Sequence, residues 1–187
     1  VRFAEERRVG LTVADSEEEL RKLAALHPSS DVLLRIAVDD SQAQCVMSCK
    51  YGAPLEALPS LLTTALELNL SVRGVSYHVG SGCYSTSAFV DAVARASHAF
   101  GVAARHGVHM DLLDVGGGFP GTDSEALSFG SIATALRSAL AEHFPPSRGV
   151  RVIAEPGRFM AASSHALAVN IIGSKTVATA PGAPPHT

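Results

Sequence analysis

A carboxylate and a guanidinium stand three residues apart in the segment Ile153-Ala-Glu-Pro-Gly-Arg158, on either side of a Pro-Gly turn. The turn follows an apolar stretch, so Glu155 and the anion-binding Arg158 are held on one tight loop. Few ligands need both groups. Pyridoxal phosphate does, because its ring nitrogen is held protonated at one end and its phosphate is bound at the other. A charged pair on a solvated turn gives the same pattern, so this segment indicates a cofactor site only if other segments supply further binding groups.

A run of three glycines, Gly116–Gly118, follows the apolar stretch that ends near Asp114. Without a Cβ, these residues let backbone N–H groups converge on an anion. Together with Gly121 they match the dinucleotide pattern G-x-G-x-x-G, but that fingerprint needs a helix that opens within the motif. Pro120 postpones the next helix to about Ser124. We therefore interpret the glycines as a phosphate nest, with an ordinary glycine-rich connection as the alternative.

A histidine and a serine end another apolar stretch, in the segment Tyr77-His-Val-Gly-Ser-Gly82. A lone histidine among apolar neighbours is commonly a core residue. Here Ser81 adds a phosphate-binding hydroxyl shortly after an imidazole, His78, whose flat face can stack on an aromatic cofactor. A serine-hydrolase elbow needs a glycine where Val79 stands, which argues against nucleophilic serine chemistry.

Arg35 interrupts an apolar stretch, and a buried guanidinium is costly unless it is paired. A structural role and a ligand-binding role are equally open for it. The acidic pair Asp39-Asp40 beyond it is interpreted as a turn rather than a metal site. No metal site is predicted, because the remaining histidines lack the spacing of metal ligands.

Short apolar, β-branched stretches predict buried strands over 9–14, 32–38, 72–79, 110–115 and 150–154. Helical spacing predicts helices over 16–26, 55–68, 87–106 and 126–144. Strands that alternate with helices imply parallel pairing with right-handed crossovers. Because His78, Asp114 and Glu155 each follow a different strand, a barrel is favoured over an open doubly wound sheet. Five strands are roughly half to two-thirds of an eight-stranded barrel.

Composition indicates an ordinary globular protein of 187 residues with a net charge of −3, which argues against nucleic-acid and membrane partners. Three cysteines without a CxxC pair fit a reducing, cytoplasmic setting. No apolar stretch is long enough for a membrane span or a signal peptide. The first methionine is Met47, so we expect a fragment, and the Pro-rich residues 176–187 are predicted to be a disordered tail.

Three segments, 74–83, 113–121 and 154–158, closely resemble the eukaryotic-type ornithine-decarboxylase family, a branch of the alanine-racemase-like, fold type III decarboxylases that use pyridoxal 5′-phosphate. Segments 34–41, 49–52 and 167–172 extend the resemblance over nearly the whole chain. It implies an α/β fold, with residues 1–160 forming the C-terminal part of a pyridoxal-phosphate-binding (β/α)8 TIM barrel. Residues 161–175 are expected to begin the connection to a β-rich domain that this chain lacks.

The resemblance also implies a role for each residue of the site. His78 stacks on the pyridine ring, Glu155 faces its nitrogen, and Arg158 pairs with the phosphate. Catalytic roles fall to His78 and Glu155. The implied cofactor-binding set is Arg35, His78, Ser81, Gly116, Gly117, Gly118, Glu155, Pro156, Gly157 and Arg158. A carboxylate keeps the ring nitrogen protonated, whereas racemases of this fold place an arginine there, so Glu155 points to decarboxylation.

The implied reaction is decarboxylation of a basic amino acid, with L-ornithine to putrescine, a step of polyamine biosynthesis, as the first expectation. The resemblance further implies a homodimer and an antizyme-like regulator as partners. The lysine that holds the cofactor is expected upstream of Val1, so the fragment alone should be inactive; Lys50 matches a loop lysine instead. Two alternatives stay open: a catalytically silent homologue of the antizyme-inhibitor type, and a metal-dependent barrel hydrolase that uses His78, Asp114 and Glu155.

Overall fold

A five-stranded parallel sheet forms the centre of the computed structural model, which describes residues 1–125, 127–170, 172 and 173. The strand order along the sheet is β1-β2-β4-β6-β7, and every neighbouring pair is parallel. The strands are β1 (Leu11–Ala14), β2 (Asp31–Arg35), β4 (Ser71–Ser76), β6 (Leu112–Asp114) and β7 (Arg151–Ile153). All five predicted strands are therefore present, and each is shorter than its apolar stretch. The prediction of a buried strand was wrong for β7, because β7 lies at the edge of the sheet and its Arg151 and Val152 are exposed.

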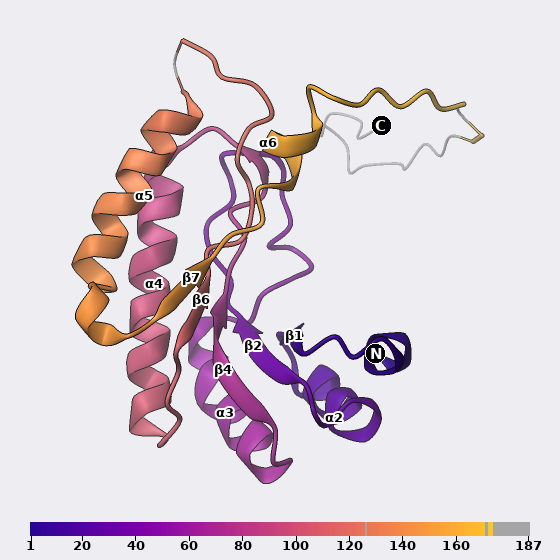
Figure 1. Ribbon diagram of the computed structural model, residues 1–187, viewed down its shortest axis with the longest axis vertical. Coiled ribbons are helices and arrows are strands. Elements are labelled where there is room, and N and C mark those ends of the chain that lie inside the picture. The colour runs from indigo at the N-terminus through magenta and orange to yellow at the C-terminus, as the bar shows by residue number, and fades with distance from the viewer. Residues whose placement is uncertain (126, 171, 174–187) are drawn as a thin grey trace, which may run out of the picture.

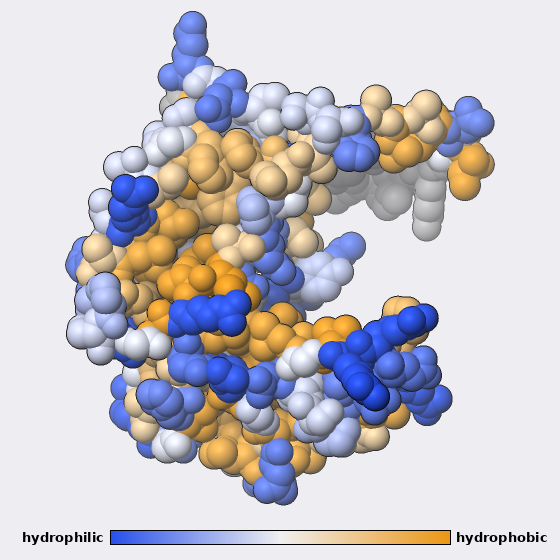
Figure 2. Space-filling view, viewed as in Figure 1, coloured by the Kyte–Doolittle hydropathy of each residue, from blue (hydrophilic) through white to orange (hydrophobic). Residues whose placement is uncertain are grey.

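Four long helices connect consecutive strands and lie on one side of the sheet, while the other side faces an open hollow (Figures 1 and 2). The helices are α2 (Glu17–Leu26), α3 (Leu58–Glu67), α4 (Thr86–Arg105) and α5 (Phe129–His143). A strand-helix alternation of this kind puts consecutive strands parallel, because each helix carries the chain back to the same end of the sheet. None of the helices in the described ranges has the length and apolar character needed to span a membrane.

The start of α5 is the clearest difference from the predicted helices. The helix begins at Phe129, whereas helical spacing placed its start at Ala126. Ser128 caps the helix by accepting a hydrogen bond from the Ser131 backbone N–H, and the Asp123 carboxylate accepts one from the Phe129 N–H. Side-chain acceptors at these positions satisfy the first N–H groups and so decide where the helix starts.

Several short elements were not predicted. An antiparallel pair, β3 (Ala43–Cys45) and β5 (Ser81–Cys83), lies outside the main sheet, and α1 (Arg2–Glu6), α6 (Gly157–Ala161) and the 3-10 turn Pro146–Arg148 are each three to five residues long. A second 3-10 turn, Leu55–Ala57, forms the start of the helix predicted over 55–68 and leads into α3. Elements of this length have no periodicity that a sequence pattern can show.

The stretch 166–172 contains several β-prone residues and lies within the connection expected over 161–175. Residues 166–170, 172 and 173 form no strand, and the side chains of Leu167 and Ile172 are 88% and 99% exposed. A strand needs a partner for its backbone hydrogen bonds, and no neighbouring strand lies beside this stretch in the described ranges. The predicted tail, 176–187, lies outside the described residues.

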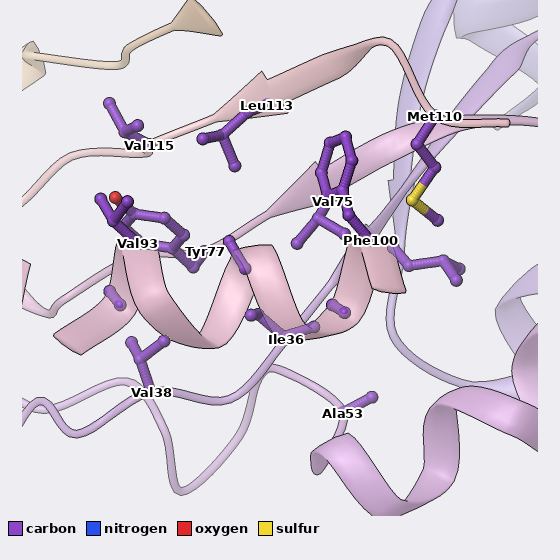
Figure 3. Close-up of a cluster of buried hydrophobic side chains, with 14 of the residues drawn as sticks. Ile36, Val38, Ala53, Val75, Tyr77, Val93, Phe100, Met110, Leu113 and Val115 are labelled. Carbon is purple, nitrogen blue, oxygen red and sulfur yellow. The ribbon is translucent and has the colours of Figure 1, made fainter. Parts of the chain in front are cut away.

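The hydrophobic core lies between the sheet and its helices (Figure 3). Val75 of β4 and Tyr77, which follows that strand, pack there with Leu113 of β6, with Val115 just after β6 and with Val93 of α4. Successive side chains of a strand point to opposite faces. The residues between these core positions therefore face the hollow.

Three polar side chains share one level on the hollow face of the sheet. Arg35 of β2 is in register with Ser76 of β4, which is in register with Asp114 of β6. We call Arg35, Ser76 and Asp114 the polar row. Ser76 and Asp114 are buried, whereas Arg35 is half-buried. A polar layer at this level separates the apolar inner sheet from the loops that follow the strands.

Candidate functional site

The loops that carry the predicted site residues meet at the carboxyl edge of the sheet. His78 and Ser81 follow β4, the glycines 116–118 follow β6, and the turn 155–158 follows β7 and leads into α6 (Figure 1). Because the strands are parallel, their carboxyl ends share one edge, which is where barrels of this kind bind ligands. The structure thus brings residues from three separate loops into one place.

Gly117 is the contact point between two of these loops. A Cβ built on Gly117 would lie 2.7 Å from the Glu155 carbonyl oxygen and 2.8 Å from His78 Nε2. Real Cβ atoms do not approach other atoms this closely, so only glycine fits at this position. His78, Gly117 and Glu155 are therefore direct neighbours, although 77 positions of sequence separate His78 from Glu155.

We expect Gly117→Ala to disturb this junction, because the added methyl group has no space and the nearest neighbours include backbone. The φ angle of Gly117 is not in the left-handed region, so the contact alone should produce the effect. Overpacking of this kind costs at least about 1 kcal/mol in the free energy of unfolding. Denaturant unfolding checks this. Gly130→Ala is the matched control, since a Cβ there finds its nearest neighbour at 3.6 Å and Gly130 lies in α5; an equal loss in both variants would contradict the prediction.

The glycine run has the geometry of an anion nest. Gly116 and Gly118 adopt positive φ angles of 60° and 109°. Their carbonyl groups are already used, since Gly116 O accepts a hydrogen bond from Glu155 N and Gly118 O accepts one from Cys83 N. Gly117 and Gly118 are buried residues, and in the described part of the chain their N–H groups have no hydrogen-bond partner. Backbone N–H groups of buried residues are rarely left unpaired, and successive N–H groups in this conformation are suited to bind an anion.

Ser81 and Arg158 are joined directly. Arg158 donates hydrogen bonds from Nε and Nη2 to Ser81 Oγ, at 3.0 and 2.9 Å. A Cβ on Gly121 would lie 3.4 Å from Arg158 Cγ, so the end of the glycine loop also contacts this arginine. The remaining N–H groups of the guanidinium are available for a ligand, and an arginine with free donors suits a phosphate.

His78 is half-buried and its ring is held in one orientation. The Gly80 N–H donates to Nδ1 at 3.1 Å, so Nδ1 is the acceptor nitrogen of the ring. Burial lowers the pKa of His78 and the Arg35 charge lowers it further, while the charges of Glu155 and Asp40 act in the opposite direction. The imidazole is therefore neutral near pH 7, and a neutral flat ring is suited to stacking on an aromatic ligand.

Arg35 lies apart from the other cations of the site. Its guanidinium stands 5.1 Å from the centre of the Tyr51 ring, and the two residues line a cavity of about 270 Å³ together with Val13, Ala14, Asp15 and Glu19. No carboxylate forms an ion pair with Arg35 in the ranges that the structure describes. Its charge nevertheless acts on His78 and on Asp114. Arg35 is thus placed to influence the site electrostatically.

The acidic residues near the site divide into two kinds. Asp39 accepts a hydrogen bond from Ser41 N, which is the predicted turn. Asp40 is buried and accepts hydrogen bonds from the Met47 and Ser48 backbone and from Ser48 Oγ, so it fixes the loop that contains Lys50.

The histidine and acidic side chains considered for a metal hydrolase do not form a group able to hold a metal ion, nor does any other such group occur among the described residues.

Asp114 is the residue whose place in the site the sequence reasoning missed. It was considered as one of three polar residues at strand ends and as a metal ligand of the hydrolase alternative, but its Oδ1 accepts a hydrogen bond from Gly116 N at 2.8 Å. Burial raises its pKa to about 6, the Glu155 charge adds to the increase, and the Gly116 N–H and the Arg35 charge oppose it. The sequence offered one signal for this role: Asp114 stands at the end of a strand, two residues before a glycine, where a carboxylate can accept a hydrogen bond from the glycine N–H.

Comparison with protein families finds a match over residues 1–162 to the family described as "Pyridoxal-dependent decarboxylase, pyridoxal binding domain". The chain is 49% identical to ornithine decarboxylase of Mus musculus, over 95% of this chain and 38% of that protein. It is 44% identical to antizyme inhibitor 2 of Xenopus laevis, over 95% of this chain and 39% of that protein. The chain therefore spans about two-fifths of the length of these curated relatives.

Among solved structures, the arginine decarboxylase of Paramecium bursaria Chlorella virus superposes with a TM-score of 0.78 and 34% identity, over 84% of this chain and 42% of that one. The parallel sheet with its outer helices is accordingly a partial (β/α)8 barrel of the alanine-racemase-like type, which confirms the predicted fold class.

Proposed function

Because the chain belongs to the pyridoxal-binding domain family of the pyridoxal-dependent decarboxylases, we propose that it binds pyridoxal 5′-phosphate at the carboxyl edge of its sheet. We further propose that the full-length protein decarboxylates a basic amino acid, with L-ornithine as the first candidate. The observation that carries the cofactor proposal is the pair of N–H groups of the buried residues Gly117 and Gly118, which have no partner in the described chain and belong to the loop that contacts Arg158 through Gly121.

The phosphate end of the cofactor fits this part of the site. The nest at Gly117 and Gly118 supplies two N–H donors, and Arg158 supplies charge from a guanidinium that Ser81 holds in place. Hydrogen bonds in which one partner is ionised are shorter and stronger than neutral ones. These groups would hold the phosphate without any movement of the glycine backbone, because Cys83 N and Glu155 N already anchor its carbonyl groups.

The ring end of the cofactor fits the neighbouring residues. When bound, pyridoxal phosphate supplies an electron sink for the electron pair that carbon dioxide leaves behind. The Glu155 carboxylate would hold a proton at the ring nitrogen, because a nearby negative charge favours the protonated form. The neutral imidazole of His78 would support one face of the ring, and its Nδ1 stays occupied by Gly80 N. Pro156 and Gly157 set the turn between the carboxylate and Arg158.

The relative named antizyme inhibitor 2 keeps a second candidate function open, that of a regulatory homologue without activity. The residues proposed for the cofactor favour the enzyme, since Arg35, His78, Ser81, Glu155 and Arg158 are all present. The family resemblance also supports the proposal of a cytoplasmic homodimer and an antizyme-like partner. Light scattering of the full-length protein tests the dimer.

The experiment for the main proposal measures two quantities on the full-length protein. We expect added pyridoxal phosphate to bind stoichiometrically, seen as a change in its absorbance, and carbon dioxide to be released from ornithine faster than from lysine or arginine. A protein that binds no cofactor would be the regulatory homologue instead. Cofactor binding with release from lysine or arginine alone would retain the cofactor site and overturn the substrate.

A further inference from the structure

The buried carboxylate of Asp114 has no role in the function proposed above. Its residue is only 3% exposed, at the end of β6. A buried carboxylate is costly unless other groups compensate it. Within the described ranges, Asp114 forms no ion pair, and its side chain makes one hydrogen bond, to the N–H of Gly116. Because this hydrogen bond is its one side-chain contact of that kind in the described chain, we expect the role of Asp114 at Gly116.

The hydrogen bond from Gly116 fixes the first residue of the nest. Asp114 Oδ1 holds the Gly116 N–H at 2.8 Å, while the Gly116 carbonyl accepts from Glu155 N at 2.8 Å. Gly116 is therefore restrained on both sides in its left-handed conformation, with φ of 60°. A Cβ there would lie 1.8 Å from the Tyr77 carbonyl oxygen, so the backbone is also pressed against β4. The two N–H groups that follow take their direction from this restrained residue.

We propose that Asp114 is a positioning residue for the phosphate nest: its carboxylate holds Gly116 so that the N–H groups of Gly117 and Gly118 point at the phosphate. This inference rests on the proposed cofactor binding. Asp114 does not touch the phosphate in this arrangement. It acts through the backbone, and the strength of its action depends on its charge, because an ionised acceptor binds an N–H about twice as strongly as a neutral one.

The groups around Asp114 decide when it is charged. Arg35 acts from β2, and Glu155 acts from the loop after β7; Tyr77 and His78 lie beyond the end of β4. Because burial and Glu155 raise the pKa of Asp114 to about 6, the carboxylate is ionised at pH 8 and protonated at pH 5. The positioning hydrogen bond is then strong at pH 8 and weak at pH 5.

Asp114→Asn and Asp114→Ala test the inference in the full-length protein. Titrations of the apo-protein measure the dissociation constants of pyridoxal phosphate and of pyridoxal, which lacks the phosphate. At pH 8 we expect Asp114→Ala to weaken pyridoxal phosphate binding about tenfold and Asp114→Asn about fivefold, with pyridoxal binding unchanged. At pH 5 wild type and Asp114→Asn should bind pyridoxal phosphate with equal dissociation constants. Taking the ratio of the two constants at each pH cancels the effect of the ligand's own titration. Ser76→Ala, from the same polar row, is the control and should bind both ligands as wild type does.

Three results would overturn the positioning role. One is an equal loss of pyridoxal and pyridoxal phosphate affinity, which indicates general damage to the fold. Another is tighter pyridoxal phosphate binding by Asp114→Asn at pH 8, which means that charge repulsion outweighs positioning. The third is unchanged binding by Asp114→Ala. Failure of the wild-type protein to bind pyridoxal phosphate would instead overturn the proposed function, so the two failures are distinguishable.

Discussion

Glu155→Ala should slow decarboxylation by the full-length protein about 10²–10⁴-fold while cofactor binding stays measurable. The carboxylate is proposed to keep the ring nitrogen protonated, and without it the ring takes up electrons less well. The backbone of the turn should survive the change, because Glu155 N is held by Gly116 O and Glu155 O by Gly157 N. Single-turnover release of carbon dioxide, measured at saturating cofactor, checks the prediction.

Two further variants separate charge from shape at this position. Glu155→Gln keeps the shape and removes the charge, so it should be nearly as slow as Glu155→Ala. Glu142→Ala removes an exposed carboxylate on α5, far from the carboxyl edge in sequence and fold, and should turn over like wild type. Unchanged turnover in Glu155→Gln would show that holding the ring proton is not the task of this residue.

Arg158→Ala should weaken pyridoxal phosphate binding about tenfold or more, because it removes the cation proposed to contact the phosphate. Ser81→Ala should cause a smaller loss, since it removes the group that orients the guanidinium but leaves the charge. Equilibrium titration of the apo-protein with pyridoxal phosphate measures both effects. Pyridoxal, without the phosphate, should bind equally to wild type and Arg158→Ala.

The control for Arg158 is available on the strand that leads to it. Arg151 is exposed at the start of β7, at the opposite end of the strand from the turn. Arg151→Ala therefore changes the net charge by the same amount without touching the site. If both arginine variants lose the same affinity, the effect is one of overall charge, and Arg158 has no direct role in binding phosphate.

Local sequence patterns predicted most of the fold. Apolar, β-branched stretches correctly indicated the five strands, because such residues suit the strands of a parallel sheet covered by helices, and the inner strands β2, β4 and β6 are mostly buried. The pairing of β3 with β5 was not visible, since it joins Ala43 to Cys83 and Cys45 to Ser81 across 40 and 36 intervening steps of chain. The described residues 166–170 form no strand although several are β-prone, because β propensity without a partner strand does not make a strand.

The sequence by itself determined the chemistry of the candidate site. Glu155, Arg158, Ser81 and the glycines were identified from residue type, spacing and position after a strand, because these properties belong to short segments and survive without a fold. The family that the motifs resembled is the family found by comparison.

Only the tertiary structure decided how these groups act on one another. It joined Ser81 to Arg158 across 77 residues, placed Gly117 between His78 and Glu155, and left two glycine N–H groups of the described chain without a partner. It also buried Asp114 against Gly116. The physical reason is that hydrogen-bond partners and desolvation arise when parallel strands align their carboxyl ends, and no single segment contains that alignment.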